Sequence, residues 1–214
     1  MTIASNIVSM MATHRMGETN QSMRETLQHL SSGLRIVSAA DDAAGQGVAT
    51  DLETTSISAR QAMRNTNDAI SILQTAEAAA TEISDMVQRT HELFVASASE
   101  TLNQDERDYL VDEYTQIRTE IDRIAGDLEF GGILLNNSSL DAQVGVYSGN
   151  DYEITLEIGD MTTSGLTLPG ELRLQDQELA RETLSGAVKS LDLATDALNE
   201  IRASIGATQN RLES

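Results

Sequence analysis

The sequence predicts a mainly α protein, an elongated bundle of long antiparallel helices with a small β-hairpin region. Three observations favour this fold class. The 214 residues include one proline, no tryptophan and 3% aromatic residues, a composition typical of long helices. Apolar residues recur at steps of three and four through most of the chain. One short stretch alternates with period two instead and predicts the hairpin.

The first predicted helix spans residues 3–34. Its apolar residues follow three-and-four steps, interrupted by a polar middle, and predict one helix face. Five of the eight methionines fall within the first 23 residues, and flexible thioether side chains suit an adaptable contact surface. Because this helix has no evident partner within the chain, we expect its face to pack against other subunits. The predicted packing residues are Ile3, Ile7, Met10, Met23, Leu27, Leu30 and Leu34.

The second predicted helix spans residues 42–99, with Asp41 and Asp42 supplying N-capping side chains. It contains no proline, and its two glycines lie near the start. Unbroken, it would be roughly 85 Å long at 1.5 Å per residue, which favours an elongated molecule. The predicted apolar stripe consists of Leu52, Ile70, Leu73, Ala76, Ala80, Ile83, Met86, Thr90 and Leu93.

A capping box from Asn103 to Glu106 predicts the start of a third helix. Its heptad seam is either the core of an intramolecular bundle or a surface for other subunits, and a bundle is the simpler interpretation. The seam consists of Leu110, Tyr114, Ile117, Ile121, Ile124 and Leu128.

The predicted hairpin has Val144 and Val146 in one strand, a turn at residues 148–150, and alternating apolar residues from Tyr152 to Ile158 in the other. Pro169 and Gly170 close this region. A last helix begins near Asp176 and shows no stop signal before Ser214, so we expect it to be still running there.

The net charge of −20, of which residues 41–170 carry −18, disfavours nucleic acid and anionic membranes as partners, because both are bound by clustered Lys and Arg. The acidic middle is expected to face water and the near-neutral N-terminal end to contact protein. No cysteine is present, which removes disulfides and thiolate metal sites. No signal-peptide pattern or membrane span is apparent.

No catalytic site, cofactor or metal site is predicted. His91 and Glu92 begin an HExxH pattern, but Val95 stands where the second zinc-binding imidazole is needed. The remaining histidines lie far apart, and no phosphate-binding glycine loop occurs. The acidic run 105–113 fits the first turns of a capped helix better than a calcium loop. Asn137 begins an N-x-S pattern that carries little weight alone.

The stretch LSSGLRIVSAADDAAGQGVA, residues 30–49, closely resembles the N-terminal signature of bacterial flagellins. Residues 64–71, 88–93 and 120–123 also resemble flagellin sequences, and residues 206–211 resemble the family's second signature. The resemblance implies a secreted structural subunit that self-assembles by helix–helix packing into the extracellular flagellar filament for motility. Implied partners are other flagellin subunits, an export chaperone and a cap protein, with export through the flagellar type III apparatus.

The resemblance also implies a layout of four parts. They are an N-terminal inner-core helix (1–40), the N-terminal helices of a rod domain (41–128), its β-hairpin part (129–170) and a truncated C-terminal rod helix (171–214). Flagellins continue into a further C-terminal helix, whereas this sequence stops at Ser214, so we expect either a truncation or a shortened variant whose N-terminal helix finds its partner elsewhere. We therefore expect this chain alone to polymerise poorly, with residues 1–30 mobile in the free monomer.

Some flagellins are sensed by a vertebrate Toll-like receptor through a rod patch, and the matching positions are Arg89, Glu92, Leu93 and Glu113. Alternatives to a filament subunit are a hook-filament junction protein, which shares the terminal helices, and an intracellular coiled-coil adaptor, which the heptads fit equally well. An enzyme is disfavoured by the broken HExxH pattern and by the lack of an inserted domain.

Overall fold

The computed structural model describes residues 7–99, 101–170 and 177–214, without the side chains of residues 177–184. The chain divides into two compact units, an N-terminal unit of residues 1–58 and a C-terminal unit of residues 59–214. Each unit is described separately below. Ile3 lies outside the described residues. The four-part layout inferred from the sequence stays a prediction.

The N-terminal unit contains helix α1 (Ile7–Ser32), a connector of residues 33–42 and the first turns of helix α2 (Ala43–Ser97). Leu34 lies in the connector, beyond the end of α1, so its placement on the first helix was wrong. The reason is local: Gly33 has a φ of 68° and its amide donates to the His29 carbonyl, which ends the helix.

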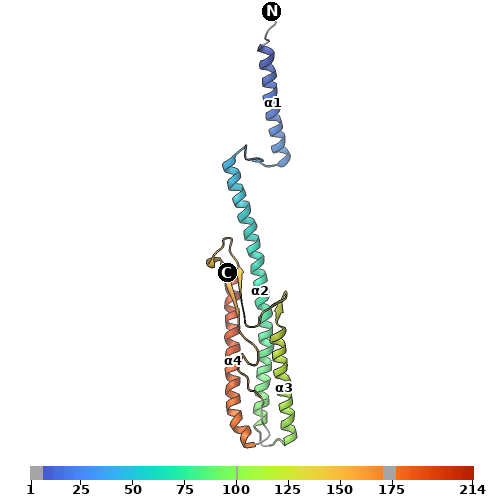
Figure 1. Ribbon diagram of the computed structural model, residues 1–214, viewed down its shortest axis with the longest axis vertical. Helices are drawn as coiled ribbons and strands as arrows, with labels where there is room; N and C mark the ends of the chain where they lie inside the picture. Colours follow the sequence, from blue (N-terminus) through green and yellow to red (C-terminus); the bar gives the residue numbers. More distant parts are fainter. Residues whose placement is uncertain (1–6, 100, 171–176) are drawn as a thin grey trace, which may run out of the picture. The chain divides into compact units, whose positions relative to one another are not determined.

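The C-terminal unit is a bundle in which the later part of α2, helix α3 (Gln104–Asp127) and helix α4 (Gln177–Glu213) lie side by side (Figure 1). The Phe94 and Tyr114 rings meet edge to face across α2 and α3, with centroids 5.1 Å apart. Arg202 on α4 donates to Glu77 on α2 at 2.9 Å. The mainly helical class with small hairpins is therefore confirmed.

The predicted stripe of α2 supplies most of this core. Leu73, Ala76, Ala80 and Ile83 are fully buried, and Leu93 is 3% exposed. Leu52 is 66% exposed, so its assignment to the stripe was wrong. The cause is its place in the chain: it belongs to the N-terminal unit, which ends at Ser58, before the residues of the bundle begin.

The heptad seam of α3 packs against the same core, and Tyr114, Ile121 and Leu128 are buried along it. The three intervening seam residues are half-buried and pack on the cluster. An intramolecular core, the simpler of the two interpretations, is thus what the seam forms.

Two antiparallel hairpins follow α3. Strand β1 (Glu129–Phe130) pairs with β2 (Ile133–Leu134), and β3 (Ser138–Gln143) pairs with β4 (Glu153–Ile158). The second strand of the predicted hairpin is confirmed, but Val144 and Val146 lie in the loop and not in a strand. The amides of Val144 and Gly145 both donate to the Tyr152 carbonyl, a two-against-one pairing that ends the ladder.

Candidate interaction surface

Helix α1 keeps its apolar side chains outside any core. The structure gives α1 no buried residue within Ile7–Ser32. The predicted packing residues of this helix are 56–77% exposed, and Leu34 in the connector is 61% exposed. Three further exposed apolar residues of α1, Val8, Met11 and Met16, were not among the predicted packing residues, although Met11 lies four residues after Ile7.

The apolar residues of α1 form two surfaces rather than one. Successive helical residues are turned by about 100°, so the N-terminal group Ile7, Met10 and Met11 faces roughly opposite to the C-terminal group that begins at Met16. The prediction of one continuous face was therefore wrong. The three-and-four steps hold within each group, but the thirteen residues from Met10 to Met23 shift the stripe by about half a turn. The C-terminal group is Met16, Met23, Leu27 and Leu30.

Exposed apolar residues continue past the connector. Val48, Leu52 and Ile57 on the first turns of α2 are 62%, 66% and 58% exposed. Isolated exposed apolar residues are ordinary, but a succession along a whole unit is typical of a contact surface. We define the candidate interaction surface as the exposed apolar residues of α1 together with these three.

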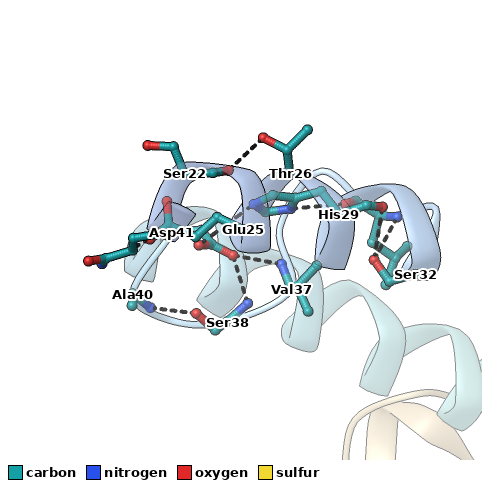
Figure 2. Close-up of polar contacts among 11 residues, drawn as sticks. Ser22, Glu25, Thr26, His29, Ser32, Val37, Ser38, Ala40 and Asp41 are labelled. Atoms are coloured by element: carbon teal, nitrogen blue, oxygen red, sulfur yellow. Dashed lines mark hydrogen bonds and ion pairs between the residues drawn. The ribbon is translucent and has the colours of Figure 1, made fainter. Parts of the chain in front are cut away.

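The connector is ordered by the carboxylate of Asp41, as Figure 2 shows. Asp41 Oδ2 accepts from the amides of Val37 and Ser38 at 3.0 Å each. These two hydrogen bonds are the main reason that the pKa of Asp41 is lowered. His29 Nδ1 lies 3.3 Å from the Leu34 carbonyl oxygen, which ties the last turn of α1 to the connector.

Of the two predicted capping carboxylates, only Asp42 caps α2. Its Oδ1 accepts from the Gly45 amide at 2.8 Å. A Cβ atom on Gly45 would lie 2.4 Å from the other carboxylate oxygen of Asp42, so a side chain at this position would require the capping carboxylate to shift. Asp41 orders the connector instead. Sequence spacing alone did not reveal which of the two neighbouring aspartates caps the helix.

The predicted receptor patch lies on the C-terminal unit. Arg89 Nη1 is 2.8 Å from Glu92 Oε2, and Arg89 Nη2 is 2.8 Å from Glu113 Oε1 across the α2–α3 pair. Both carboxylates hydrogen-bond to the guanidinium and raise the pKa of Arg89. Leu93 differs from these three because it is buried in the core.

The other candidates considered in the sequence do not gather into a chemical site. Among the side chains that the structure describes, no group of three or more His, Cys, Asp or Glu residues could hold a metal ion. His91 is half-buried on α2, while His14 pairs with Glu18 one turn away on α1. In the described part of the chain, no helix is both long enough and apolar enough to cross a membrane.

The fold and the exposed surface define a mainly helical structural protein with apolar side chains left outside its core. Residues 3–139 match the family model for the bacterial flagellin N-terminal helical region. The chain belongs to the bacterial flagellin family, as the sequence predicted, and this is a family of structural proteins rather than enzymes.

Relatives agree along nearly the whole chain. A flagellin of Salmonella typhimurium is 34% identical over 99% of this chain, and this chain spans 43% of that relative's length. The flagellar filament 33 kDa core protein of Treponema phagedenis is 33% identical over 100% of this chain and 79% of its own. The crystal structure of Bacillus cereus flagellin superposes with a TM-score of 0.58 at 32% identity, covering 71% of this chain and 85% of that one.

Proposed function

We propose that this chain is a structural subunit of the extracellular bacterial flagellar filament, assembled through the candidate interaction surface. The observation that supports this most strongly is that α1 carries eight large apolar residues within Ile7–Ser32 and buries none of them. Such a surface is costly in water and is stabilised by association with other chains. Relatives named as flagellins and as a filament core protein agree with this role.

The two-sided distribution on α1 supports an open array. The N-terminal and C-terminal groups face opposite directions, so one partner helix cannot cover both. If the patch on one side of a subunit meets the different patch on the opposite side of the next, the contact is heterologous, and it propagates into a filament when it does not close into a ring. We therefore propose that each α1 packs against at least two neighbouring elements.

The test compares Leu27→Glu with the neighbouring Gln28→Glu, since both residues are exposed on α1. Labelled protein is added to growing flagellar filament fragments, and its incorporation is measured by sedimentation and electron microscopy. Leu27→Glu should reduce incorporation at least tenfold, because burying an unpaired carboxylate is strongly unfavourable. Gln28→Glu should be tolerated, because residue 28 is turned by about 100° from Leu27 and lies off the C-terminal apolar group.

Thermal unfolding separates assembly from folding in the same experiment. Leu27 is 57% exposed and lies outside the C-terminal core, so neither variant should change the unfolding midpoint of the C-terminal unit. Equal incorporation of the parent and Leu27→Glu would contradict the proposed assembly role of α1. Failure of the parent to incorporate would contradict the proposed function itself.

We also propose three partners on the strength of the family resemblance: an export chaperone, a cap protein and a Toll-like receptor. The receptor contact would use Arg89, Glu92 and Glu113, whose charges lie exposed on two adjacent helices, with Leu93 supporting them from the core. A receptor reporter assay should respond to the parent and less to Arg89→Ala. No response to either protein would remove the receptor from the proposal.

A further inference from the structure

We propose that four methionines of α1 form an oxidation site through which peroxide controls assembly. The α1 methionines are Met10, Met11, Met16 and Met23. This inference rests on the proposed function for its consequence, because the filament is what oxidation would prevent. The chemical event itself belongs to the free chain and can be measured without assembly.

The α1 methionines are open to a dissolved oxidant. Their exposed fractions are 71% for Met10, 56% for Met11, 69% for Met16 and 56% for Met23. The chain has no cysteine and no tryptophan, so thioether sulfur is its most readily oxidised group. Half of the eight large apolar side chains of α1 therefore carry the reactive atom.

The C-terminal core is protected by contrast. Met161 is fully buried within it, and Met86 is a half-buried residue packed against it. Met63 is 66% exposed on α2 and serves as a natural comparison, since it lies outside α1. Mild oxidation should thus modify the interaction surface while leaving the bundle folded.

The reaction is a two-electron oxygen transfer. The thioether sulfur attacks one oxygen of hydrogen peroxide, the O–O bond breaks, and the S=O bond forms as the second oxygen leaves as water after taking up the proton. Sulfur is oxidised and peroxide is reduced. A dithiol reductase reverses the step: the sulfoxide oxygen leaves as water while the dithiol is oxidised to a disulfide.

The product changes what α1 can pack against. A sulfoxide is polar and needs hydrogen-bond partners when it is buried, whereas a thioether is apolar and adapts to irregular contacts. Both α1 groups are affected, because Met10 and Met11 lie on one side and Met16 and Met23 on the other. Oxidised chains should remain folded monomers until the sulfoxides are reduced.

The first experiment maps sulfoxides by peptide mass spectrometry on the free 214-residue chain treated with hydrogen peroxide. The α1 methionines should react faster than Met161 by at least an order of magnitude, since Met161 is reached only when the core opens. The unfolding midpoint of the C-terminal unit should not change. Equal rates at Met161 and α1, or loss of that unfolding transition, would overturn the proposed site whatever the filament assay shows.

The second experiment measures incorporation into filament fragments before and after peroxide treatment. Peroxide should lower incorporation of the parent at least tenfold, and sulfoxide reductase should restore it. The quadruple variant Met10→Leu, Met11→Leu, Met16→Leu and Met23→Leu should show the same incorporation before and after peroxide treatment, because leucine has no sulfur to oxidise. The control Met63→Leu should stay as sensitive as the parent.

The two experiments separate failure of the inference from failure of the proposed function. An untreated parent that does not incorporate contradicts the proposed function, while sulfoxide mapping still decides the site. An untreated parent that incorporates, with equal incorporation after oxidation of all four α1 methionines, overturns the inference alone.

Discussion

Arg107 closes the C-terminal end of α2 from inside the bundle. It is 5% exposed, and its Nη1 and Nη2 donate to the carbonyls of Ser97 and Ser99 at 2.8 and 3.0 Å. No following helical turn supplies backbone amides to these carbonyls. The buried guanidinium therefore provides the hydrogen bonds that they would otherwise lack.

Replacing Arg107 should therefore destabilise the C-terminal unit. We expect Arg107→Ala to lower the free energy of unfolding by about 1.5–3 kcal/mol, the usual range for hydrogen bonds to a charged group. Arg107→Lys should lose less stability than Arg107→Ala, because lysine keeps the positive charge. Some loss should remain, because lysine lacks the forked pair of donors. Urea denaturation measures both; a change of less than about 0.5 kcal/mol in Arg107→Ala, ordinary for a surface substitution, would contradict the capping role.

Tyr114 makes the stability of the bundle sensitive to alkaline pH. Its ring is buried and its hydroxyl donates to the Pro169 carbonyl. Burial disfavours the phenolate and raises the pKa of Tyr114 to about 12. The folded state therefore favours the neutral phenol. This preference for the phenol contributes stability that is fully present below the ordinary tyrosine pKa of about 10. The contribution is lost as pH rises toward 12.

The comparison of the parent with Tyr114→Phe tests this dependence. The parent should lose stability progressively between pH 10 and 12, and Tyr114→Phe should show a shallower loss, because one ionisation no longer opposes folding. At neutral pH the variant should be weaker by about 1 kcal/mol, the value of one hydrogen bond. Denaturant midpoints across the pH series provide the measurement, and parallel curves for the two proteins would rule out Tyr114 as the cause.

At the scale of elements, the end of β4 lies close against α4. A Cβ atom on Gly159, the residue after β4, would lie 2.7 Å from Ile201 Cγ1 and 2.8 Å from Ile201 Cδ1. Both atoms belong to one half-buried side chain on α4. A side chain at position 159 would therefore displace Ile201 or push the end of the hairpin away from the helix.

Gly159→Ala should force the two elements apart. We expect a loss of about 1–3 kcal/mol, the usual cost of overpacking a core. The double variant Gly159→Ala with Ile201→Ala should lose less than the sum of the two single variants, because removing the Ile201 atoms creates the space that the new methyl needs. A double-mutant cycle by urea unfolding measures the coupling, and strict additivity would show that the two residues do not meet.

Element prediction succeeded where the signals are local. The capping box of α3 is present with both hydrogen bonds: Asn103 Oδ1 accepts from the Glu106 amide at 2.9 Å, and the Asn103 amide donates to Glu106 at 2.8 Å. Both partners lie within one helical turn, so spacing alone specifies them. The prediction of the first hairpin strand was wrong, because the alternating apolar pattern includes Val144 as well as Leu140. Pairing with β4 is what places the strand at the earlier residues, 138–143.

For the molecule as a whole, charge opposes association. The chain carries 34 acidic and 14 basic residues, a net charge of −20, so neighbouring copies repel one another while apolar contacts draw them together. The balance depends on salt, because the Debye length falls from about 30 Å at 0.01 M to about 10 Å at 0.1 M ionic strength.

Raising sodium chloride from 0.01 to 0.1 M should therefore favour incorporation into filament fragments. The subunit concentration needed for half-maximal incorporation should fall several-fold, with sucrose at equal osmolality as the uncharged control. If ion pairs were the main attraction between subunits, salt would weaken association instead. A rise in the required concentration would thus contradict association through the apolar surface of α1.

The sequence by itself determined the family, the main helices and the capping box of α3. These follow from residues within a few turns of one another, and local spacing holds regardless of what a segment later packs against. The tertiary structure decided which apolar residues are buried: Leu52 and Leu93 share one predicted stripe, yet one is 66% and the other 3% exposed. Burial depends on partners distant in the chain, as the Tyr114–Pro169 bond across 55 residues illustrates, and no period within one helix specifies such partners.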